Sequence, residues 1–349
     1  MASEPERPLC FPLCPTASAR AAVGKVSRGQ PKLFFGGLLV AVVAMSAGCN
    51  VIQYQQGRIR SHLADAGLRE TQVQLGDDTI SYWDGGSGDP VVLLHGLGMA
   101  GMWQWNEQAS ALVRRHRVII PDLLWFGGSS SSRRDFSLRH QIAAMRALID
   151  HLGLSQVDLV GASYGGIVAY GVATSGSTRI RSLVLADSPG PAFGSADYAE
   201  LITRLGTNDP TEIFIPQTPK AVQRLMALAY QHPPYIPDFA ARQLIAEAYT
   251  KRREELHALF NASSGNIEKL TEAPPHITQP LCVIWGRNDP IFPLAVSDRL
   301  LNFASNRTAR HVVEDARHSP NVEHPKQFNQ VLQACLAFAV EPQPGALAR

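Results

Sequence analysis

The stretch Val157-Asp158-Leu159-Val160-Gly161-Ala162-Ser163-Tyr164-Gly165-Gly166 is the most informative part of this chain. An apolar run typical of a buried strand leads into Gly-x-Ser-x-Gly, and the residues that follow favour a helix. A serine at the apex of so tight a turn is lifted clear of the sheet, and the crowded backbone needs small residues two positions to either side. Gly161 and Gly165 meet this need. The pattern predicts a nucleophile elbow with Ser163 at its tip, facing the positive end of a helix.

Short apolar runs rich in β-branched residues occur on both sides of this motif. Continuous rather than alternating hydrophobicity indicates strands buried on both faces, as in a parallel sheet covered by helices. Two strand-like segments joined through Gly76-Asp77-Asp78 precede them as a hairpin. We therefore predict an α/β protein with a mostly parallel eight-stranded sheet, helices on both faces, and strands at residues 71–75, 79–83, 91–94, 118–120, 157–160, 183–185, 281–284 and 312–313.

One long segment, between Pro189 and Pro280, lacks any strand signal and has helical periodicity instead. Thr218 and Pro219 suit the N-cap and first position of a helix whose apolar face carries Val222 and its periodic neighbours. We predict a helical cap inserted after the sixth strand, where it can roof the carboxyl ends of the strands; an insertion with only a packing role is the alternative. The predicted organisation is a core at residues 71–189 and 280–340, a cap at 190–279 and a tail at 341–349.

The N-terminal region resembles a bacterial lipoprotein signal. Basic residues precede an apolar stretch at 33–47, and Ser46-Ala47-Gly48-Cys49 places small residues directly before a cysteine. We expect residues 1–48 to be a leader, Cys49 to become lipidated, and residues 49–70 to form a tether or short helix leading away from the membrane. This predicts a lipoprotein of the bacterial envelope, facing the periplasm or the exterior. An uncleaved anchor helix is the alternative, although the apolar run is shorter than the roughly 20 residues of a comfortable span.

The composition and the motifs limit the classes of partner and cofactor that we expect. A net charge of +2 without any long Lys/Arg run gives no electrostatic case for nucleic acid. We expect no metal and no organic cofactor, because no HExxH, metal-spaced Cys/His cluster or Walker A motif occurs. The oligomeric state is left open. Of the five cysteines, Cys10 and Cys14 belong to the leader, Cys49 to the lipid, Cys282 to a buried strand and Cys335 to an amphipathic helix, so we expect no disulfide framework.

Five motifs in chain order resemble the successive signatures of the α/β-hydrolase superfamily. They are His95-Gly96-Leu97-Gly98, Asp122-Leu123-Leu124-Trp125-Phe126-Gly127-Gly128-Ser129, Gly161 to Gly166, Trp285-Gly286-Arg287-Asn288-Asp289 and Arg317-His318-Ser319-Pro320. The cap, including residues 215–219, is similar to the membrane-bound monoacylglycerol lipase group and related bacterial lipases. The resemblance implies a serine esterase or lipase whose partners are a lipid or small ester substrate and the membrane. Trp125 departs from the small residue usual in its loop.

A serine hydroxyl needs a base within hydrogen-bond reach, and a carboxylate must orient that base. His318 follows the last strand and lies on a loop at the carboxyl edge of the sheet, so it is the predicted base. Asp289 follows the apolar run at residues 283–286, and the fuller match of residues 286–290 to the superfamily motif makes it the favoured acid. Asp187 competes with it, because some members of the superfamily carry their acid after the strand that follows the nucleophile.

The oxyanion hole is predicted from two backbone N–H groups, those of Leu97 and Tyr164. His95 is interpreted as a structural residue that fixes its loop. Aromatic residues could line an acyl-chain pocket, although most aromatics serve the core. The candidates are Trp103, Trp105, Trp125, Phe214, Tyr230 and Phe292, with Trp103, Trp125, Phe214 and Phe292 preferred.

Several alternatives share these motifs. Residues 96–101 satisfy the dinucleotide pattern G-x-G-x-x-G with Asp122 after the next strand, but the preceding hairpin, His95 and the bulky Trp103 speak against a dehydrogenase. A catalytically silent lipid-binding lipoprotein is a second alternative. Thioester hydrolysis, cleavage of carbon–carbon bonds and cofactor-free peroxidation could use the same triad. Serine at position 163 argues against epoxide hydrolases and haloalkane dehalogenases, which need a carboxylate nucleophile.

Overall fold

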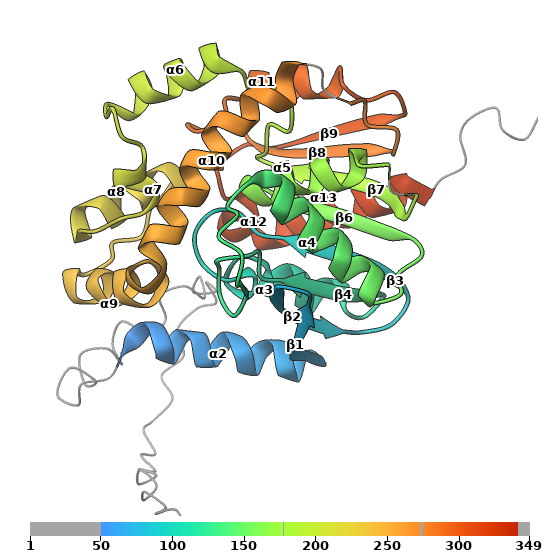
Figure 1. The fold of residues 1–349 in the computed structure, drawn as a ribbon, viewed down its shortest axis with the longest axis horizontal. Coiled ribbons are helices and arrows are strands. Elements are labelled where there is room, and N and C mark those ends of the chain that lie inside the picture. Colours follow the sequence, from blue (N-terminus) through green and yellow to red (C-terminus); the bar gives the residue numbers. More distant parts are fainter. Residues whose placement is uncertain (1–49, 177, 273–274, 341–349) are drawn as a thin grey trace, which may run out of the picture. The chain divides into compact units, whose positions relative to one another are not determined.

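A twisted sheet organises the part of the chain that the structure describes, residues 50–176, 178–272 and 275–340 (Figure 1). In this computed structural model, the strands of those residues are β1 Leu68–Leu75, β2 Asp78–Gly85, β3 Asp89–Leu94, β4 His116–Pro121, β5 Ser130–Ser131, β6 Val157–Ala162, β7 Ile180–Ala186, β8 Leu281–Gly286 and β9 Thr308–Val313. Eight of them follow the order β1-β2-β4-β3-β6-β7-β8-β9, and β5 pairs with β2. From β4 to β9 neighbouring strands are parallel, while β2 is antiparallel to β1, β4 and β5.

The central strands are buried on both faces. Along β3, Val91 and Leu93 join the hydrophobic cluster on one side of the sheet, while Val92 and Leu94 join the cluster on the other. This confirms the mostly parallel, doubly covered sheet expected from continuous apolar runs. The two-residue β5 was not predicted, because two serines carry no hydrophobic signal.

Helices cover both faces, as predicted. Helices α2 Val51–Asp65, α3 Gly101–Leu112 and α13 Pro325–Val340 contribute buried side chains to the cluster on one face. Helices α4 Leu138–His151, α5 Tyr164–Thr174 and α11 Leu294–Leu301 contribute to the other. The short α12 Pro320–Glu323 leads from the last strand into α13. The loops at the carboxyl ends of β3, β6, β7 and β8 therefore meet at one edge of the sheet.

Between β7 and β8, the sixth and seventh strands along the eight-strand path, the described chain is helical. It forms α6 Ser195–Leu205, α7 Thr211–Phe214, α8 Pro219–Ala229, α9 Asp238–Ala248, a 3-10 turn at Thr250–Arg252 and α10 Arg253–Glu272. The expected helix start is confirmed, because the Thr218 side chain accepts a hydrogen bond from Ala221 N–H and Pro219 is the first helical residue. These helices gather at one side of the sheet (Figure 1).

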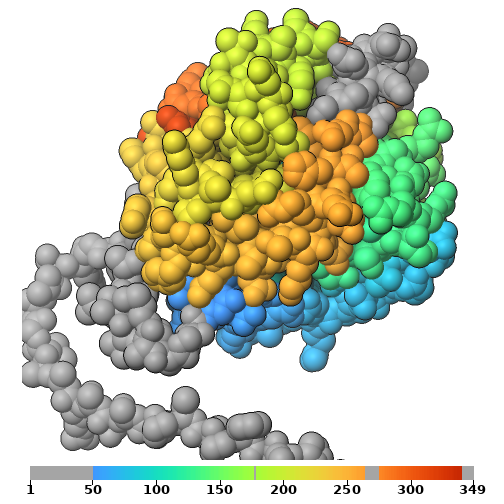
Figure 2. Space-filling view, turned by 60° about the vertical axis from the view of Figure 1, so that its left-hand side comes forward, coloured from blue at the N-terminus to red at the C-terminus, as the bar shows by residue number. Residues whose placement is uncertain are grey.

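The segment after Cys49 is folded against the rest of the chain. Asn50 caps α2 by accepting hydrogen bonds from the N–H groups of Ile52 and Gln53, and its own amide donates to Glu247 of α9 at 2.8 Å. Ile59 and Leu63 of α2 are buried in the core. Figure 2 shows blue α2 directly beneath the yellow and orange helices that follow β7. Part of the expected tether is thus a packed helix.

The predicted leader (residues 1–48) and the lipidation site Cys49 lie outside the described residues. Within the described ranges, no helix combines the length and the apolar character needed to cross a bilayer.

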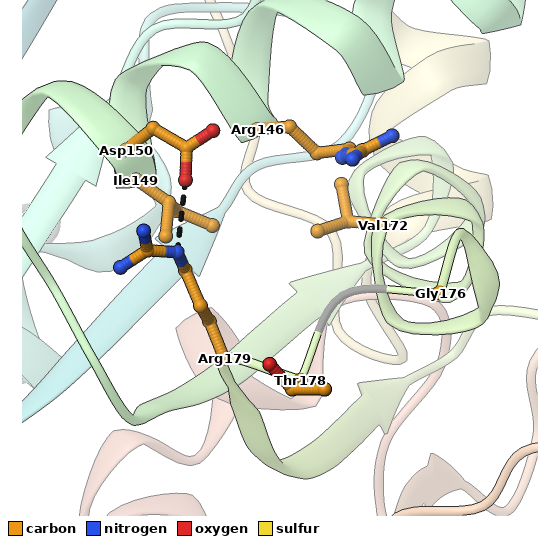
Figure 3. A pocket seen from close by; sticks show the side chains of 7 residues that line it. All are labelled: Arg146, Ile149, Asp150, Val172, Gly176, Thr178 and Arg179. Atoms are coloured by element: carbon orange, nitrogen blue, oxygen red, sulfur yellow. Dashed lines mark ion pairs between the residues drawn. The ribbon is translucent and has the colours of Figure 1, made fainter.

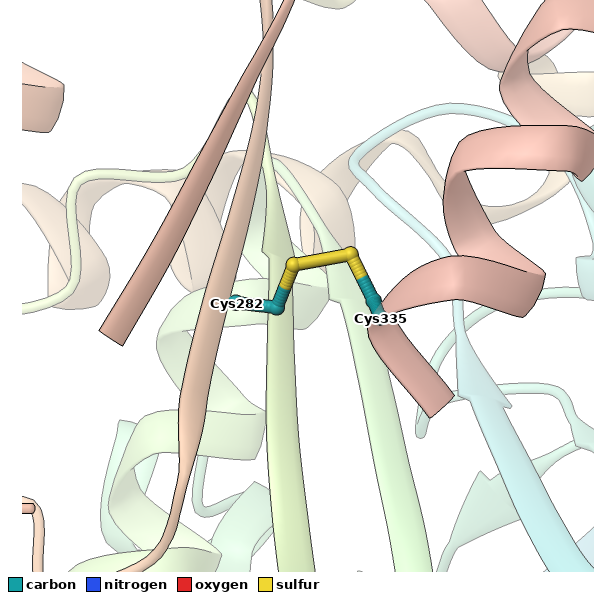
Figure 4. Close-up of a disulfide and its surroundings, with 2 residues drawn as sticks. All are labelled: Cys282 and Cys335. Atoms are coloured by element: carbon teal, nitrogen blue, oxygen red, sulfur yellow. A yellow bond between two sulfur atoms is a disulfide. The ribbon is translucent and has the colours of Figure 1, made fainter. Parts of the chain in front are cut away.

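A disulfide joins Cys282 of β8 to Cys335 of α13, with their Cα atoms 5.7 Å apart (Figure 4). The expectation of no disulfide was therefore wrong. The two cysteines are 53 residues apart in sequence, and they meet because α13 returns across the face of the sheet above β8. Neither residue carries a local pattern that could reveal this pairing.

Candidate active site

Ser163 lies between the end of β6 and the start of α5, with φ 50° and ψ −122°. This conformation is uncommon for a residue with a side chain, and the neighbouring glycines explain how it is tolerated. A Cβ on Gly161 would lie 2.5 Å from the carbonyl oxygen of Gly165, and a Cβ on Gly165 would lie 2.3 Å from that of His95. Any larger residue at either position would push the turn apart. The local geometry is therefore that of the sharp elbow predicted from the sequence.

Two further loops bring a histidine and a carboxylate to this serine. His318, after β9, has Nε2 2.9 Å from Ser163 Oγ, and its Nδ1 lies 2.8 Å from Asp289 Oδ2. Asp289 is held in place because its Oδ1 accepts hydrogen bonds from the N–H groups of Ile291 and Phe292 at 2.8 and 3.1 Å. Since a carboxylate only accepts, Nδ1 of His318 carries the proton and Nε2 is free to accept the serine proton.

The second candidate acid, Asp187, lies at the end of β7 and is 1% exposed. Its Oδ1 accepts a hydrogen bond from Gly286 N–H at 2.8 Å. Burial, and then the charge of the nearby Asp289, raise the pKa of Asp187 well above its ordinary value. The carboxylate hydrogen-bonded to His318 is that of Asp289, so the geometry favours Asp289 of the two candidates for orienting the imidazole.

The two predicted oxyanion donors flank Ser163. Tyr164 is the first residue of α5, so its N–H has no acceptor within the helix. Leu97 lies on the loop after β3, and the preceding residue fixes that loop because Gly96 N–H donates to Gln104 Oε1 at 2.7 Å. A Cβ on Gly96 would lie only 3.0 Å from Cβ of Ser163. The loop that carries Leu97 therefore passes close to Ser163.

His95 is completely buried and cross-links two loops, in line with its interpretation as structural. Its Nε2 accepts the Leu123 N–H at 3.0 Å, and its Nδ1 donates to the Gly96 carbonyl at 2.7 Å. Burial lowers the pKa of His95, which suits a neutral ring with one donor and one acceptor. The side chain of the nearby Asp122 accepts hydrogen bonds from the N–H groups of Gly101 and Gly128, so it organises the same loops.

A sequence model described as the Alpha/beta hydrolase family matches residues 91–331, which include all three loops of this site. The chain belongs to the alpha/beta hydrolase family. Membership agrees with the resemblance drawn from the motifs and with the observed sheet order.

Relatives of this alpha/beta hydrolase include an esterase, a lipase and a semialdehyde hydrolase. Pimeloyl-[acyl-carrier protein] methyl ester esterase of Aeromonas hydrophila is 30% identical over 254 residues, which cover 71% of this chain and 95% of the relative. Lipase 1 of Psychrobacter immobilis is 25% identical over 304 residues, which cover 84% of this chain and 92% of the relative. 2-hydroxymuconate semialdehyde hydrolase of Pseudomonas sp. (strain CF600) is 28% identical over 270 residues (73% and 89%).

Solved structures show the same fold. A bacterial membrane phospholipase A aligns with a TM-score of 0.73 at 24% identity, covering 89% of this chain and 99% of that one. A 2-hydroxy-6-oxo-6-phenylhexa-2,4-dienoate hydrolase from Rhodococcus sp. strain RHA1 aligns with a TM-score of 0.66 at 21% identity, covering 77% and 99%. At sequence identities this low, the similarity to both structures shows the fold alone.

The predicted pocket aromatics of this alpha/beta hydrolase separate into different environments. The ring of Phe292 lies 5.5 Å from that of His318 and 5.0 Å from that of Phe193, a residue that the sequence reasoning missed. Trp125 packs on Phe136, and Phe214 stacks on Phe260. Trp103 packs on the cluster beneath α3, on the opposite face of the sheet from the Phe292 cluster, and Trp105 is wholly buried there. Phe292 is thus the preferred candidate that packs against the triad histidine.

The helical insertion is fastened to the loop that carries His318. Ser319 N–H donates to the Ala229 carbonyl at the end of α8 at 3.0 Å. Glu323 accepts the Gln231 N–H through Oε1 at 2.6 Å and the Arg317 N–H through Oε2 at 2.8 Å. These bonds hold the end of α8 next to the loop that carries His318.

A pocket of about 200 Å³ lies elsewhere, between the ends of α4 and α5 and the beginning of β7 (Figure 3). Arg179 and Asp150, whose side chains form an ion pair at 2.9 Å, line it together with Arg146 and Thr178. Since it lies at the amino end of β7 and Ser163 follows the carboxyl end of β6, this pocket has no access to the triad.

Two groups of possible metal ligands occur among the described residues. In one, Cys282 and Cys335 are joined to each other as a disulfide beside His311. In the other, Asp289 and His318 already belong to the hydrogen-bonded chain that ends on Ser163. In each group, two of the three residues are thus already bonded to each other.

Proposed function

We propose that this alpha/beta hydrolase is a serine hydrolase that cleaves carboxylic esters, with monoacylglycerols or similar lipid esters as substrates, while tethered to a membrane of the cell envelope. The observation that carries the proposal is the continuous chain from Ser163 Oγ through His318 to Asp289, with links of 2.9 and 2.8 Å. Such a chain moves a proton from a serine hydroxyl as the hydroxyl attacks a carbonyl carbon.

In the proposed mechanism, Ser163 Oγ bonds to the ester carbonyl carbon while His318 Nε2 takes the hydroxyl proton. The N–H groups of Leu97 and Tyr164 donate to the oxyanion, and Asp289 stabilises the imidazolium. When the C–O bond of the ester breaks, His318 returns the proton to the leaving alcohol and an acyl-enzyme remains. A water molecule, deprotonated by His318, then hydrolyses the acyl-enzyme and frees the acid and Ser163.

Lipid esters are favoured by the surroundings of the triad and by the N-terminal motif. The rings of Phe292 and Phe193 provide an apolar wall beside His318, which suits an acyl chain. The lipoprotein-like motif ending at Cys49 would place the enzyme next to its substrates. The Cys282–Cys335 disulfide supports an envelope location, because disulfides persist in oxidising compartments. The similarity to Lipase 1 points the same way.

A second candidate function is hydrolysis of a carbon–carbon bond. The similarity to 2-hydroxymuconate semialdehyde hydrolase favours it, because that relative is 28% identical over most of its length. The two candidates share the triad and differ in the substrate, so parallel assays with esters and with a 2-hydroxymuconate semialdehyde separate them.

The decisive experiment compares the wild type with Ser163→Ala on p-nitrophenyl esters and monoacylglycerols of graded chain length. We expect the variant to lose about 10⁴- to 10⁶-fold in kcat, because the nucleophile is gone. A fluorophosphonate probe should label the wild type and fail to label the variant.

Ser188→Ala is the matched control, since the Ser188 hydroxyl is buried without a partner among the described residues and takes no part in the mechanism. It should keep wild-type turnover. Wild-type-like turnover in Ser163→Ala would contradict the mechanism, and cleavage of the semialdehyde in preference to every ester would favour the second candidate.

A further inference from the structure

A second buried carboxyl group lies beside the one that orients His318. Strands β7 and β8 are parallel neighbours with Ala186 opposite Ile284, so the loops that follow them emerge side by side. These loops carry Asp187 and Asp289. One carboxylate oxygen of each, together with a ring nitrogen of His318, lie within 4.8 Å of one another.

Only one of the two carboxylate oxygens of Asp187 has a hydrogen-bond partner among the described residues. Oδ1 accepts the Gly286 N–H at 2.8 Å, whereas Oδ2 is buried and finds no hydrogen-bond partner among the described residues. Buried polar atoms are rarely left in this state, because each unsatisfied group destabilises the fold. An oxygen that carries a proton, and is turned toward a carboxylate, would be satisfied.

The charges around Asp187 favour this proton. Burial is the largest cause that raises the pKa of Asp187, and the negative charges of Asp289 and Glu323 raise it further; the Gly286 N–H acts in the opposite direction. His318, the other titratable group in the cluster, already donates to Asp289. Ionising a second carboxylate this close to Asp289 and this deeply buried costs extra free energy, which favours a proton on Asp187.

We propose that Asp187 is a positioning residue, which stays protonated and donates a hydrogen bond from Oδ2 to the carboxylate of Asp289. The inference rests on the proposed serine-hydrolase function, because Asp289 matters through the base that it orients. A neutral Asp187 holds Asp289 in place without adding a second negative charge beside the imidazole. The imidazole of His318 therefore faces one charged carboxylate and not two.

The test measures, as a function of pH, the second-order rate at which a fluorophosphonate probe labels Ser163. Asp187→Asn keeps both bonds, since its carbonyl can accept the Gly286 N–H and its amide can donate to Asp289. We expect this variant to retain the acidic limb of the wild-type profile. Asp187→Ala removes the donor, so labelling should fall about 10- to 100-fold and the limb should move to higher pH, because Asp289 then stabilises the imidazolium more strongly.

Two outcomes would overturn the proposal. A shift of the acidic limb to lower pH in Asp187→Asn would mean that the wild type carries an ionised Asp187. Wild-type rate and limb in Asp187→Ala would mean that Asp187 does not act on the triad. If thermal melting shows that Asp187→Ala is unfolded, infrared spectra decide: the carbonyl band of a protonated carboxylic acid should be present in the wild type at neutral pH and absent in Asp187→Asn.

The readouts separate this inference from the proposed substrate. Labelling of Ser163 needs no natural substrate. If the wild type and the Asp187 variants label as expected but the enzyme hydrolyses no acylglycerol, the proposed substrate is wrong and the proposed role of Asp187 is supported. The infrared band needs no turnover at all, and therefore tests Asp187 even if Ser163 proves unreactive.

Discussion

Backbone strain is concentrated at three residues in loops that follow strands of the central sheet. Among the described residues other than glycine, Trp125, Ser163 and Asp187 have positive φ, at 74°, 50° and 44°. Each follows the carboxyl end of a central strand, namely β4, β6 or β7. Such conformations persist only where the surrounding structure enforces them, and they tend to cluster at functional sites. Ser163 and Asp187 lie at the triad, while Trp125 is buried and packs on Phe136.

His95 yields a prediction about pH and stability at the scale of a single residue. Burial lowers the pKa of His95 in the folded state, while in the unfolded chain it returns to about 6.5. Below pH 6.5 the unfolded state therefore binds a proton that the folded state does not. The free energy of unfolding should fall with decreasing pH, by up to about 1.4 kcal/mol per pH unit from this group.

The measurement is denaturant unfolding at a series of pH values, from neutral down to about one unit below the pKa of histidine in the unfolded chain. His95→Gln removes the titrating ring, so its stability should depend less steeply on pH than that of the wild type, whatever its absolute stability. His276→Gln, at an exposed histidine, serves as the control and should keep the wild-type slope. Equal slopes for the wild type and His95→Gln would show that His95 is not held neutral by burial.

At the scale of elements, the loops of the site are carried by strands and helices, and two of these elements are joined by a covalent bond. β8 leads directly to Asp289, and α13 follows the loop of His318 through α12. The disulfide between Cys282 and Cys335 joins this strand to this helix. The two later triad residues are thus carried by elements that are covalently linked.

Loss of this link should reduce stability. Because the cysteines are 53 residues apart, the chain-entropy contribution of the cross-link is about 4 kcal/mol at most. We expect Cys335→Ala to lower the free energy of unfolding by up to that amount in denaturant titrations. A reductant should destabilise the wild type similarly and leave the variant unaffected. A wild type that is insensitive to reductant, with both thiols titratable in the denatured chain, would contradict the cross-link.

At the scale of the whole molecule, the N-terminal motif predicts where the enzyme works. If Cys49 is the lipidated first residue of the mature protein, mass spectrometry should find a chain beginning at Cys49 with acyl chains attached, and a fatty-acid label should be incorporated in cells. Cys49→Ala should abolish the label and leave the leader in place.

Cys10→Ala, within the expected leader, is the matched control and should be processed as the wild type. Detection of an unlabelled protein that keeps its residues before position 49 would favour an uncleaved anchor helix over a lipoprotein.

Local patterns were sufficient to predict the eight strands of the main path, the helical segment between β7 and β8, and the elbow. Steric demands on Gly161 and Gly165, and continuous hydrophobicity on buried strands, act over a few residues and can therefore be recognised in the chain. The elbow pattern, the chain order of a triad and the resemblance to the superfamily motifs pointed to Ser163, His318 and Asp289, which the structure places within hydrogen-bond distance.

The remaining features depend on contacts between residues far apart in sequence. The pairing of Cys282 with Cys335, and the packing of Phe193 beside Phe292, arise only once the helices are laid across the sheet. The proximity of Asp187 to Asp289 follows from the register of two parallel strands joined by a long insertion. No local pattern encodes such a register, because burial of the whole core determines it. The sequence by itself determined which groups could carry the chemistry, and the tertiary structure alone decided which of them touch.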